Sequence, residues 1–416
     1  MTQFWSGKRV LITGVSGFVG PYLASELLER GAVVHGMLRA RADRLLSRGL
    51  VDRGLAGAVK FVEADVEELY GLLHALDEVQ PDVVFHLAAH SFVQSSFENP
   101  LQAAQANAIG TANVLEAVRL RATQARLVFA GSSEEYGLVF TSQDHYQRMQ
   151  TKYGDIFPAP AHLPELPIRE TNPLRPMSPY AVSKVYGDHL VRTYARAYGI
   201  HGVVSRAFNH EGGGRGIVFV TSQIASQAVR WALHELDAIT LGDVNSFRDW
   251  SHVRDIVRGY LLLAEQGAPG GVYNLGSERT NSVLTYLLLA LQEVGAPVHA
   301  LTTLRGTKPV DGPAEIQRLR LWESEFDVTR IDRLMLTEGL RFAPEDEGLL
   351  LATDKGDLRL VFDPQRMRPS DVPVLMCDAS RSRELGFQSA ISLAEIVRDQ
   401  INFYQVPRNR QAHSAR

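Results

Sequence analysis

The feature that most constrains this chain is a set of three evenly spaced glycines directly after an apolar run near its start. Gly14, Gly17 and Gly20 follow residues 8–13, KRVLIT, which have the composition of a buried strand, and residues 19–30 have the apolar spacing of a helix. Glycines at such a turn let the backbone approach a ligand closely, and the helix N-terminus favours an anion. The pattern predicts a dinucleotide site, and the alternative is a tight turn that binds nothing.

The same alternation of short β-branched runs and longer amphipathic segments continues along the chain. Further strands are predicted at 32–38, 59–63, 82–87, 126–130, 201–206 and 271–275. Further helices are predicted at 66–79, 101–121, 178–198, 217–235, 282–294 and 392–404. This order favours the α/β class, with a Rossmann-type doubly wound parallel sheet and a smaller, discontinuous α/β domain.

The predicted domains interleave along the sequence. The nucleotide-binding domain is expected at 1–206 with 250–281, the substrate-binding domain at 207–249 with 282–407, and a polar tail at 408–416. Residues 138–177 are too long for an ordinary loop, so we expect a lid or a partner-contacting insertion there. Residues 304–367 are poorly patterned, apart from a hairpin predicted from the runs 349–353 and 358–362.

Composition excludes several other classes of protein. The formal charge of −4 lacks the basic excess of a nucleic-acid binder. With Cys377 as the one cysteine, an internal disulfide and a cysteine metal cluster are impossible, and His86, His90 and His210 are not spaced as zinc ligands. We find no signal peptide and no apolar run of about 18 residues, so we expect a cytoplasmic protein without membrane, nucleic-acid or metal partners.

The ends of the second and third predicted strands bear on the choice of dinucleotide. An acid after strand two would bind the ribose 2′-hydroxyl of NAD and repel the 2′-phosphate of NADP. The chain instead has Arg39, then Arg41 and Arg44, with no acid until Asp43. Arginine suits a phosphate, so the sequence favours NADP, and the alternative is a solvated basic loop. Asp65, after strand three, could cap the next helix, hydrogen-bond the adenine, or do both.

A tyrosine and a lysine are spaced so that they share one face of a predicted helix. Ser178-Pro179 has the form of a helix start, and Tyr180 and Lys184 follow at positions i and i+4. A nearby ammonium stabilises a phenolate, which can then accept a hydroxyl proton near neutral pH. Such a pair is frequent by chance, but here it follows the fifth strand of a nucleotide-binding pattern.

Polar residues also follow the fifth strand, at the sheet edge where ligands bind. If the extended backbone persists, Ser132, Glu134 and Tyr136 point one way, whereas Ser133 and Glu135 point the other. A hydroxyl and a carboxylate would then face the substrate together. The alternative is a polar turn without a role.

These motifs together resemble a known family. TGVSGFVG (13–20), HLAA (86–89), GSSEEYG (131–137), SPYAVSK (178–184) and RDW (248–250) are similar to the extended short-chain dehydrogenases that act on nucleotide sugars. Within that family, FNHEGGGRG (208–216) followed by FVT and RDW resembles the GDP-mannose 4,6-dehydratases, and GSSEEYG and LRPMSPYAVSK equally resemble the related GDP-4-keto-6-deoxymannose reductases. Two features depart from the dehydratases: Ser222-Gln223 stands where they carry basic residues, and Asp371 replaces a Glu.

The resemblance implies specific roles for residues of this chain. It implies catalysis by Ser132, Glu134, Tyr180 and Lys184. It implies NADP contacts by Gly14, Ser16, Gly17, Phe18, Val19, Gly20, Arg39, Asp65, Val66, Leu87, Ala88, Ala89, Tyr180, Lys184, His210 and Arg215. It implies contacts with a nucleotide-diphosphate sugar, most simply GDP-linked, by Ser91, Ser133, Asn209, Arg248, Arg368 and Asp371. For His210 and Arg215 the alternatives are a structural histidine and an exposed loop charge.

The resemblance leaves three functions open. In a 4,6-dehydratase, Glu134 removes the C5 proton after oxidation at C4, and the product is a 4-keto-6-deoxy sugar. In an NADPH-dependent reductase of a 4-keto-6-deoxy nucleotide sugar, Glu134 is only a polar wall. A catalytically silent NADP-binding scaffold is the third possibility, although the chain keeps Ser132, Tyr180 and Lys184. The family also implies a homodimer or homotetramer, in which helices 101–121 and 178–198 pair with their copies.

Overall fold

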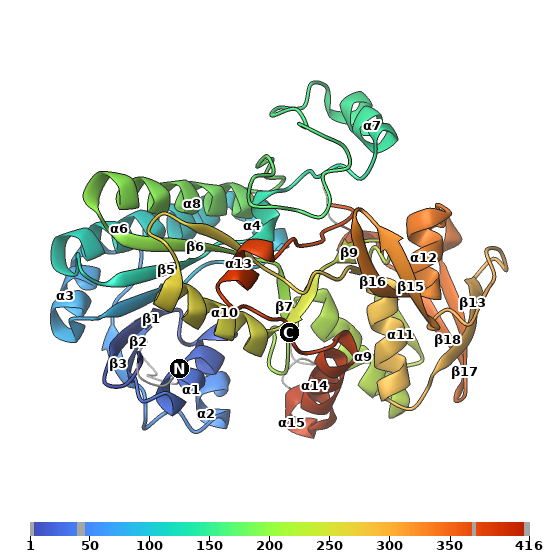
Figure 1. Ribbon diagram of the computed structural model, residues 1–416. Coiled ribbons are helices and arrows are strands. Elements are labelled where there is room, and N and C mark those ends of the chain that lie inside the picture. Colours follow the sequence, from blue (N-terminus) through green and yellow to red (C-terminus); the bar gives the residue numbers. More distant parts are fainter. Residues whose placement is uncertain (1–3, 40–45, 368–371, 412–416) are drawn as a thin grey trace.

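The computed structural model describes residues 4–39, 46–367 and 372–411, and its centre is a seven-stranded sheet with every strand parallel (Figure 1). The strand order is β3-β2-β1-β4-β5-β6-β11. The bounds are β1 Arg9–Thr13, β2 Val33–Leu38, β3 Lys60–Glu63, β4 Val83–His86, β5 Arg126–Ala130, β6 His201–Ala207 and β11 Val272–Leu275. Each strand lies within one residue of its prediction, and the Rossmann-type doubly wound sheet is confirmed.

Helices cover both faces of this sheet, as the alternation of side chains along β1 requires (Figure 1). Val10 and Ile12 pack into one core cluster, and Leu11 packs into the other. On one face lie α1 (Val19–Glu29) and α10 (Val253–Gln266), which contact each other; on the other lie α3 (Leu69–Val79), α6 (Gly110–Arg121) and α8 (Pro179–Tyr198). Among the described residues, no helix combines the length and apolar character needed to cross a membrane.

Three predicted helices differ from the observed ones by more than one residue, and the one predicted at 217–235 spans only Val220–Ala232. The segment 101–121 is not one regular helix, because a π-helical turn, η1 (Ala104–Ile109), separates α5 (Pro100–Ala103) from α6. Helix α3 begins at Leu69 rather than at residue 66. Asp65 is not its cap: the Asp65 carboxylate accepts from Glu67 N–H at 3.1 Å in a turn that precedes the helix.

A second lobe is built on a five-stranded sheet with the order β14-β13-β17-β18-β8. Its strands are β8 Ala238–Leu241, β13 Val298–Thr303, β14 Val310–Asp311, β17 Gly348–Thr353 and β18 Gly356–Phe362. Antiparallel pairing of β17 with β18 confirms the predicted hairpin. Helices α9 (Val220–Ala232), α11 (Val283–Glu293) and α14 (Leu393–Gln405) pack on one another beside this sheet. The predicted domain boundaries stay predictions.

The segment 304–367 contains more structure than its sequence pattern indicated. It also forms a hairpin of β15 (Ile316–Leu321) and β16 (Ser324–Thr329), followed by α12 (Arg330–Thr337). Short elements complete the described chain: α2 Arg48–Asp52, α4 Val93–Glu98, η2 Ser133–Glu135, α7 Gln143–Tyr153, β7 Asn209–Glu211, β9 Phe247–Arg248, β10 Trp250–His252, β12 Asn281–Ser282, η3 Pro344–Asp346, η4 Pro364–Arg366, α13 Ser380–Glu384 and α15 Pro407–Gln411.

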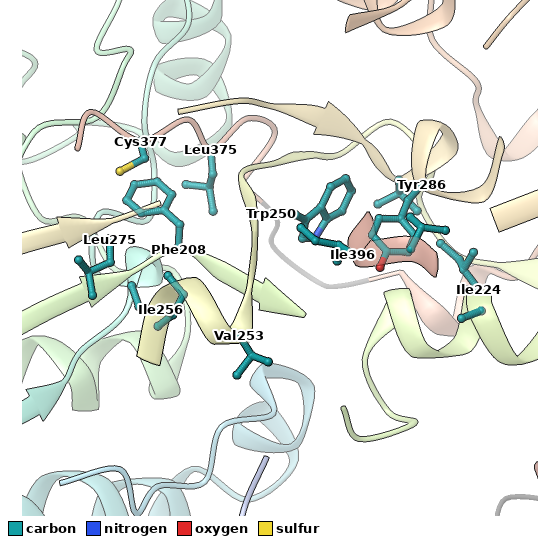
Figure 2. Packing of buried hydrophobic residues seen from close by; sticks show 14 of the residues in the cluster. Phe208, Ile224, Trp250, Val253, Ile256, Leu275, Tyr286, Leu375, Cys377 and Ile396 are labelled. Carbon is teal, nitrogen blue, oxygen red and sulfur yellow. The ribbon is translucent and has the colours of Figure 1, made fainter. Parts of the chain in front are cut away.

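One hydrophobic core runs from the first lobe into the second (Figure 2). Phe208, at the end of β6, lies near Leu275 of β11, and Trp250 lies beside Tyr286 of α11. The rings of Trp250 and Tyr286 meet edge to face with centroids 5.0 Å apart. Because these buried side chains belong to one cluster, the two lobes are held by shared apolar packing.

The insertion at 138–177 carries α7 away from both sheets (Figure 1). Its base is fixed by a buried ion pair, in which Arg175 donates to both carboxylate oxygens of Glu165 at 2.9 Å. Near its far end, Phe157 is 91% exposed. A lid or a partner contact therefore stays a prediction for this segment.

Candidate active site

A cavity of about 630 Å³ lies along the edge of the large sheet where the strands end. It is lined by every residue that the sequence analysis assigned to the cofactor: Gly14, Ser16, Gly17, Phe18, Val19, Gly20, Arg39, Asp65, Val66, Leu87, Ala88, Ala89, Tyr180, Lys184, His210 and Arg215. The catalytic candidates Ser132 and Glu134 line the same cavity. The fold thus gathers residues that are widely separated in sequence around one space.

The glycine turn after β1 has the form that a dinucleotide requires. Gly14 has φ +73°, and a Cβ there would lie 2.8 Å from Ala88 N; a Cβ on Gly20 would lie 2.5 Å from Val15 O. Side chains at either position would collide with backbone, so the turn is reserved for glycine. Helix α1 begins directly after it, and its first turn lines the cavity. The cradle therefore fits a nicotinamide dinucleotide, with the pyrophosphate at the start of α1.

Charged groups line the end of the cavity that lies next to β2 and β3. Arg39 is exposed and lines the cavity, as do Glu63 and Asp65. Arg41 and Arg44 lie outside the described residues. Glu63 was not predicted to belong to the site, because it was interpreted only as the last residue of the third strand.

Buried hydrogen bonds hold the loop after β4 in place. His86 is bonded on both ring nitrogens, by Thr13 at 2.8 Å and Thr111 at 3.0 Å, and burial lowers its pKa to about 3. Asn107, in the π-helical turn, accepts from His90 N–H at 2.7 Å and donates to Ser183 at 3.0 Å. The π turn thus presents Asn107 to the loop, a role that periodicity alone does not reveal.

Helix α8 places Tyr180 and Lys184 on the cavity wall, one turn apart. Its start is as predicted: Pro179 is the first helical residue, and Ser178 Oγ accepts from Ala181 N–H at 3.1 Å. Lys184 Nζ donates to Ala130 O at 2.7 Å and lies 5.9 Å from the centre of the Tyr180 ring. Lys184 therefore lies between the end of β5 and Tyr180 and contacts both.

Burial acts on the protonation of both groups. It lowers the pKa of Lys184 to about 8, and the charge of Glu135 opposes this shift. It raises the pKa of the Tyr180 phenol, and a hydrogen bond with Ser132 opposes that shift. Burial therefore disfavours the phenolate form of Tyr180. Positive charge and hydrogen-bond donors at the phenol oxygen are needed to favour phenolate.

The backbone after β5 does not stay extended, so the predicted alternation is wrong beyond Ser132. Residues Ser133–Glu135 form a 3₁₀ turn, in which Ser132 Oγ accepts from Glu134 N–H at 3.2 Å. Tyr136 points into the core, where its hydroxyl donates to Asn274 at 2.6 Å. Ser133, predicted to face away, lines the cavity with Ser132 and Glu134.

The two neighbouring glutamates have opposite environments. Glu134 is half-buried on the cavity wall. Glu135 is fully buried, where its carboxylate accepts from Ser132 N–H at 2.7 Å and lies 3.3 Å from Arg206. Glu134 is thus the carboxylate in reach of a ligand, as expected, although a turn and not strand alternation separates the two.

Aromatic rings and an arginine form the cavity wall beside the glycine turn. Arg215 lies 3.7 Å from the centre of the Phe219 ring and 5.1 Å from that of Phe18, and it pairs with Glu211 at 3.5 Å. His210 stacks on Phe18, and burial beside Arg215 lowers its pKa to about 4. Arg215 therefore reaches the cavity of its own chain, next to the start of α1, and is not an exposed loop charge.

The residues assigned to substrate are only partly brought together. Ser91, Ser133 and Asn209 line the cavity. Arg248 does not: it is buried, and its guanidinium donates to Phe247 O at 2.9 Å and to Val372 O at 2.7 Å. Arg368 and Asp371 lie outside the described residues. Phe219, just before α9, and Tyr260 of α10 also line the cavity and were missed, because an apolar residue gives no site signal of its own.

Comparisons with known sequences agree over most of the chain. The model of the NAD dependent epimerase/dehydratase family matches residues 10–276. The GDP-mannose 4,6-dehydratase of Sinorhizobium fredii (strain HH103) is 31% identical over 407 residues, which cover 95% of this chain and 97% of that protein. The GDP-mannose 4,6-dehydratase of Yersinia enterocolitica is 30% identical, and the match covers 95% of this chain and 93% of that protein.

Solved structures share the fold at lower identity. DesIV of Streptomyces venezuelae, a dTDP-glucose 4,6-dehydratase with NAD and TYD bound, has a TM-score of 0.66 and 21% identity over 96% of this chain and 98% of that one. RMD of Pseudomonas aeruginosa, complexed with NADPH, has a TM-score of 0.62 and 21% identity, over 96% of this chain and 99% of that one. Both structures therefore share the fold of this chain over nearly its whole length.

Proposed function

Because the chain belongs to the NAD dependent epimerase/dehydratase family, we propose that it is a nucleotide-sugar 4,6-dehydratase with NADP as cofactor and a GDP-mannose-like substrate. The reaction removes one water and yields a 4-keto-6-deoxy sugar. Support for the substrate comes from relatives named for this activity that match nearly the whole chain.

The observation that carries the proposal is that Glu134 lines the same cavity as Ser132, Tyr180 and Lys184. Oxidation at C4 needs a group that takes a hydroxyl proton. Elimination across C5 and C6 needs, in addition, a base for the C5 proton. A carboxylate beside the tyrosine and serine supplies that second group, which reduction of a 4-keto sugar does not use.

Each side chain has a defined part in the proposed reaction. Ser132 orients the C4 hydroxyl, Tyr180 takes its proton, and the Lys184 ammonium favours the phenolate form. The C4 ketone then acidifies C5–H, and Glu134 removes that proton and gives it to the C6 hydroxyl, which leaves as water. The proton that Tyr180 took from the C4 hydroxyl balances the one that C5 regains when hydride adds at C6. The chemistry supplied by a bound nicotinamide is removal of hydride from C4 and its return at C6, so no cofactor is consumed.

The experiment that tests this function is incubation with a panel of nucleotide sugars without added cofactor, followed by mass spectrometry. Loss of the mass of one water from GDP-mannose is the expected result. Turnover of a 4-keto-6-deoxy sugar that requires added NADPH would instead identify a reductase. Binding of NADP without any turnover would identify a silent scaffold.

Cofactor preference gives a first prediction. Arg39→Asp should weaken NADP binding roughly tenfold and shift the preference to NAD, because the new carboxylate repels a 2′-phosphate and can bind a 2′-hydroxyl. Fluorescence titration with both cofactors measures the ratio of dissociation constants. Arg333→Asp changes an exposed arginine of α12, outside the cavity, and should leave the ratio unchanged. An unchanged ratio in Arg39→Asp would refute the assignment.

We also propose that the chain forms a homodimer, alone or paired into a tetramer. Large apolar side chains are exposed along the face made by α5, η1, α6 and α8: Leu101, Ile109, Leu120, Val182, Tyr186 and Tyr198. A row of this kind on adjacent helices suits pairing with a second copy. Light scattering after gel filtration measures the mass. The cytoplasmic location stays a prediction from sequence.

A further inference from the structure

A cluster of buried charges lies beneath the catalytic candidates and has no part in the chemistry described above. We name Glu135, Asp188 and Arg206 the Glu135 cluster; each is at most 2% exposed. Arg206 lies between the two carboxylates, 3.3 Å from Glu135 and 2.9 Å from Asp188. Burying three charges is expensive even when they are paired, and apolar packing could replace them, so stability is a weak reason for the cluster.

The Glu135 cluster touches the site through the backbone that carries Ser132. One carboxylate oxygen of Glu135 accepts from Ser132 N–H at 2.7 Å. The same oxygen would lie 2.5 Å from a Cβ on Gly131, so the carboxylate packs directly against this backbone. The preceding carbonyl, Ala130 O, accepts from Lys184 Nζ at 2.7 Å. Glu135 thus supports the stretch of chain that presents the Ser132 hydroxyl and receives the Lys184 ammonium.

Charge links the Glu135 cluster to Lys184 as well. The titratable and charged groups that face Glu135 or Lys184 are Tyr180 and Asp188 of α8, Arg206 of β6, His86 of β4, and Tyr136 after η2. Arg192 pairs with Asp188 at 2.7 Å, so the positive groups are Lys184, Arg206 and Arg192, and the acidic groups are Glu135 and Asp188. Burial and the charge of Asp188 raise the pKa of Glu135 to about 8, whereas the charges of Arg206 and Lys184 lower it. Removing the Glu135 carboxylate would remove the negative charge that favours the ammonium form of Lys184.

We propose that Glu135 is a positioning residue, which fixes the Ser132 backbone by its hydrogen bond and balances the Lys184 ammonium by its buried charge. Its effect on turnover rests on the proposed function. Its effect on Lys184 does not, and can be measured without substrate. Glu135→Gln is the informative change, because the amide keeps the shape and the acceptor oxygen but removes the charge.

The test is competitive acetylation of lysines by acetic anhydride across neutral to alkaline pH, read by mass spectrometry. In the parent protein, Lys184 should titrate near pH 8. In Glu135→Gln, the midpoint should fall by about one pH unit. Asp188→Asn removes the neighbouring charge that raises the pKa of Glu135, without touching Ser132, so it should favour the Glu135 carboxylate and raise the Lys184 midpoint. It also carries the test if Glu135→Gln does not fold.

The matched control is Glu165→Gln, which removes a carboxylate from the buried ion pair with Arg175, outside the cavity. It should leave the Lys184 midpoint unchanged. Glu135→Asp keeps the charge and should restore the midpoint toward that of the parent. A parental midpoint in both Glu135→Gln and Asp188→Asn would overturn the proposal, whatever substrate the protein turns over.

Turnover separates this inference from the proposed function. With GDP-mannose, Glu135→Gln should lower kcat about tenfold with little change in KM, because a smaller fraction of Lys184 is then in the ammonium form while the cavity wall stays. The alkaline limb of its pH profile should move down with the Lys184 midpoint. If the parent protein does not dehydrate GDP-mannose, the proposed function is refuted and the role of Glu135 is not. If the alkaline limb of the pH profile does not shift in Glu135→Gln, the role of Glu135 is refuted.

Discussion

Tyr180→Phe is expected to leave the fold and cofactor binding nearly intact while turnover falls roughly 10²–10⁴-fold. The change removes one hydroxyl from the cavity wall, and the ring and its packing remain. The loss is large because the phenol oxygen is the group that receives the substrate proton. Steady-state assays of GDP-mannose dehydration, beside thermal unfolding and NADP titration of the same samples, separate these effects.

A second tyrosine on the same helix provides the control for Tyr180→Phe. Tyr194 lies on α8 outside the cavity, where its hydroxyl donates to Glu116 at 3.2 Å. Tyr194→Phe also removes one hydroxyl and should retain parental turnover. If Tyr180→Phe turns over within a factor of a few of the parent, Tyr180 has no place in the mechanism.

Glu134→Gln should allow the first half of the reaction, oxidation at C4, and block the second half, elimination of water. Oxidation at C4 does not use this carboxylate, so addition of GDP-mannose should still produce the absorbance of reduced nicotinamide on the protein. Elimination needs the base, so release of the 4-keto-6-deoxy product should fall roughly 10²-fold or more. The accumulation of reduced cofactor without product is a signature that a misfolded variant cannot give.

The opposite outcome would identify the related reductase. In a reductase no C5 proton moves, so Glu134→Gln would consume a 4-keto sugar and NADPH at close to the parental rate. Glu68→Gln, at an exposed carboxylate before α3, is the control and should change neither half. Glu135 is unsuitable for that purpose, because its carboxylate is buried against Ser132 and Arg206.

The strands of the large sheet could be predicted to within a residue because most of them, the edge strand β3 excepted, are buried on both faces. Such strands are continuous apolar runs bounded by polar or glycine residues, so the limits of each run indicate where the strand begins and ends. The glycine turn and the start of α8 were predictable for a similar reason, since each depends on a few residues with fixed conformational preferences.

The turn after β5 was wrongly predicted although its signal was present. Ser132 and Glu135 form a capping box, with serine and glutamate three residues apart, and this pairing starts a helical turn. Reading the same residues as an extension of the strand placed Tyr136 in the site instead of the core. The π turn around Asn107 was not predictable, because hydrogen bonds with the loop after β4 and with Ser183 of α8, and not local periodicity, hold it.

The core that Trp250 and Tyr286 share has a thermodynamic consequence. Residues of both lobes belong to one apolar cluster, so neither lobe can lose its packing without exposing the other. Calorimetry should then record a single transition rather than two. A dinucleotide bound in the cavity along the large sheet would therefore raise the melting temperature of the second lobe as well, because the two lobes unfold as one cooperative unit.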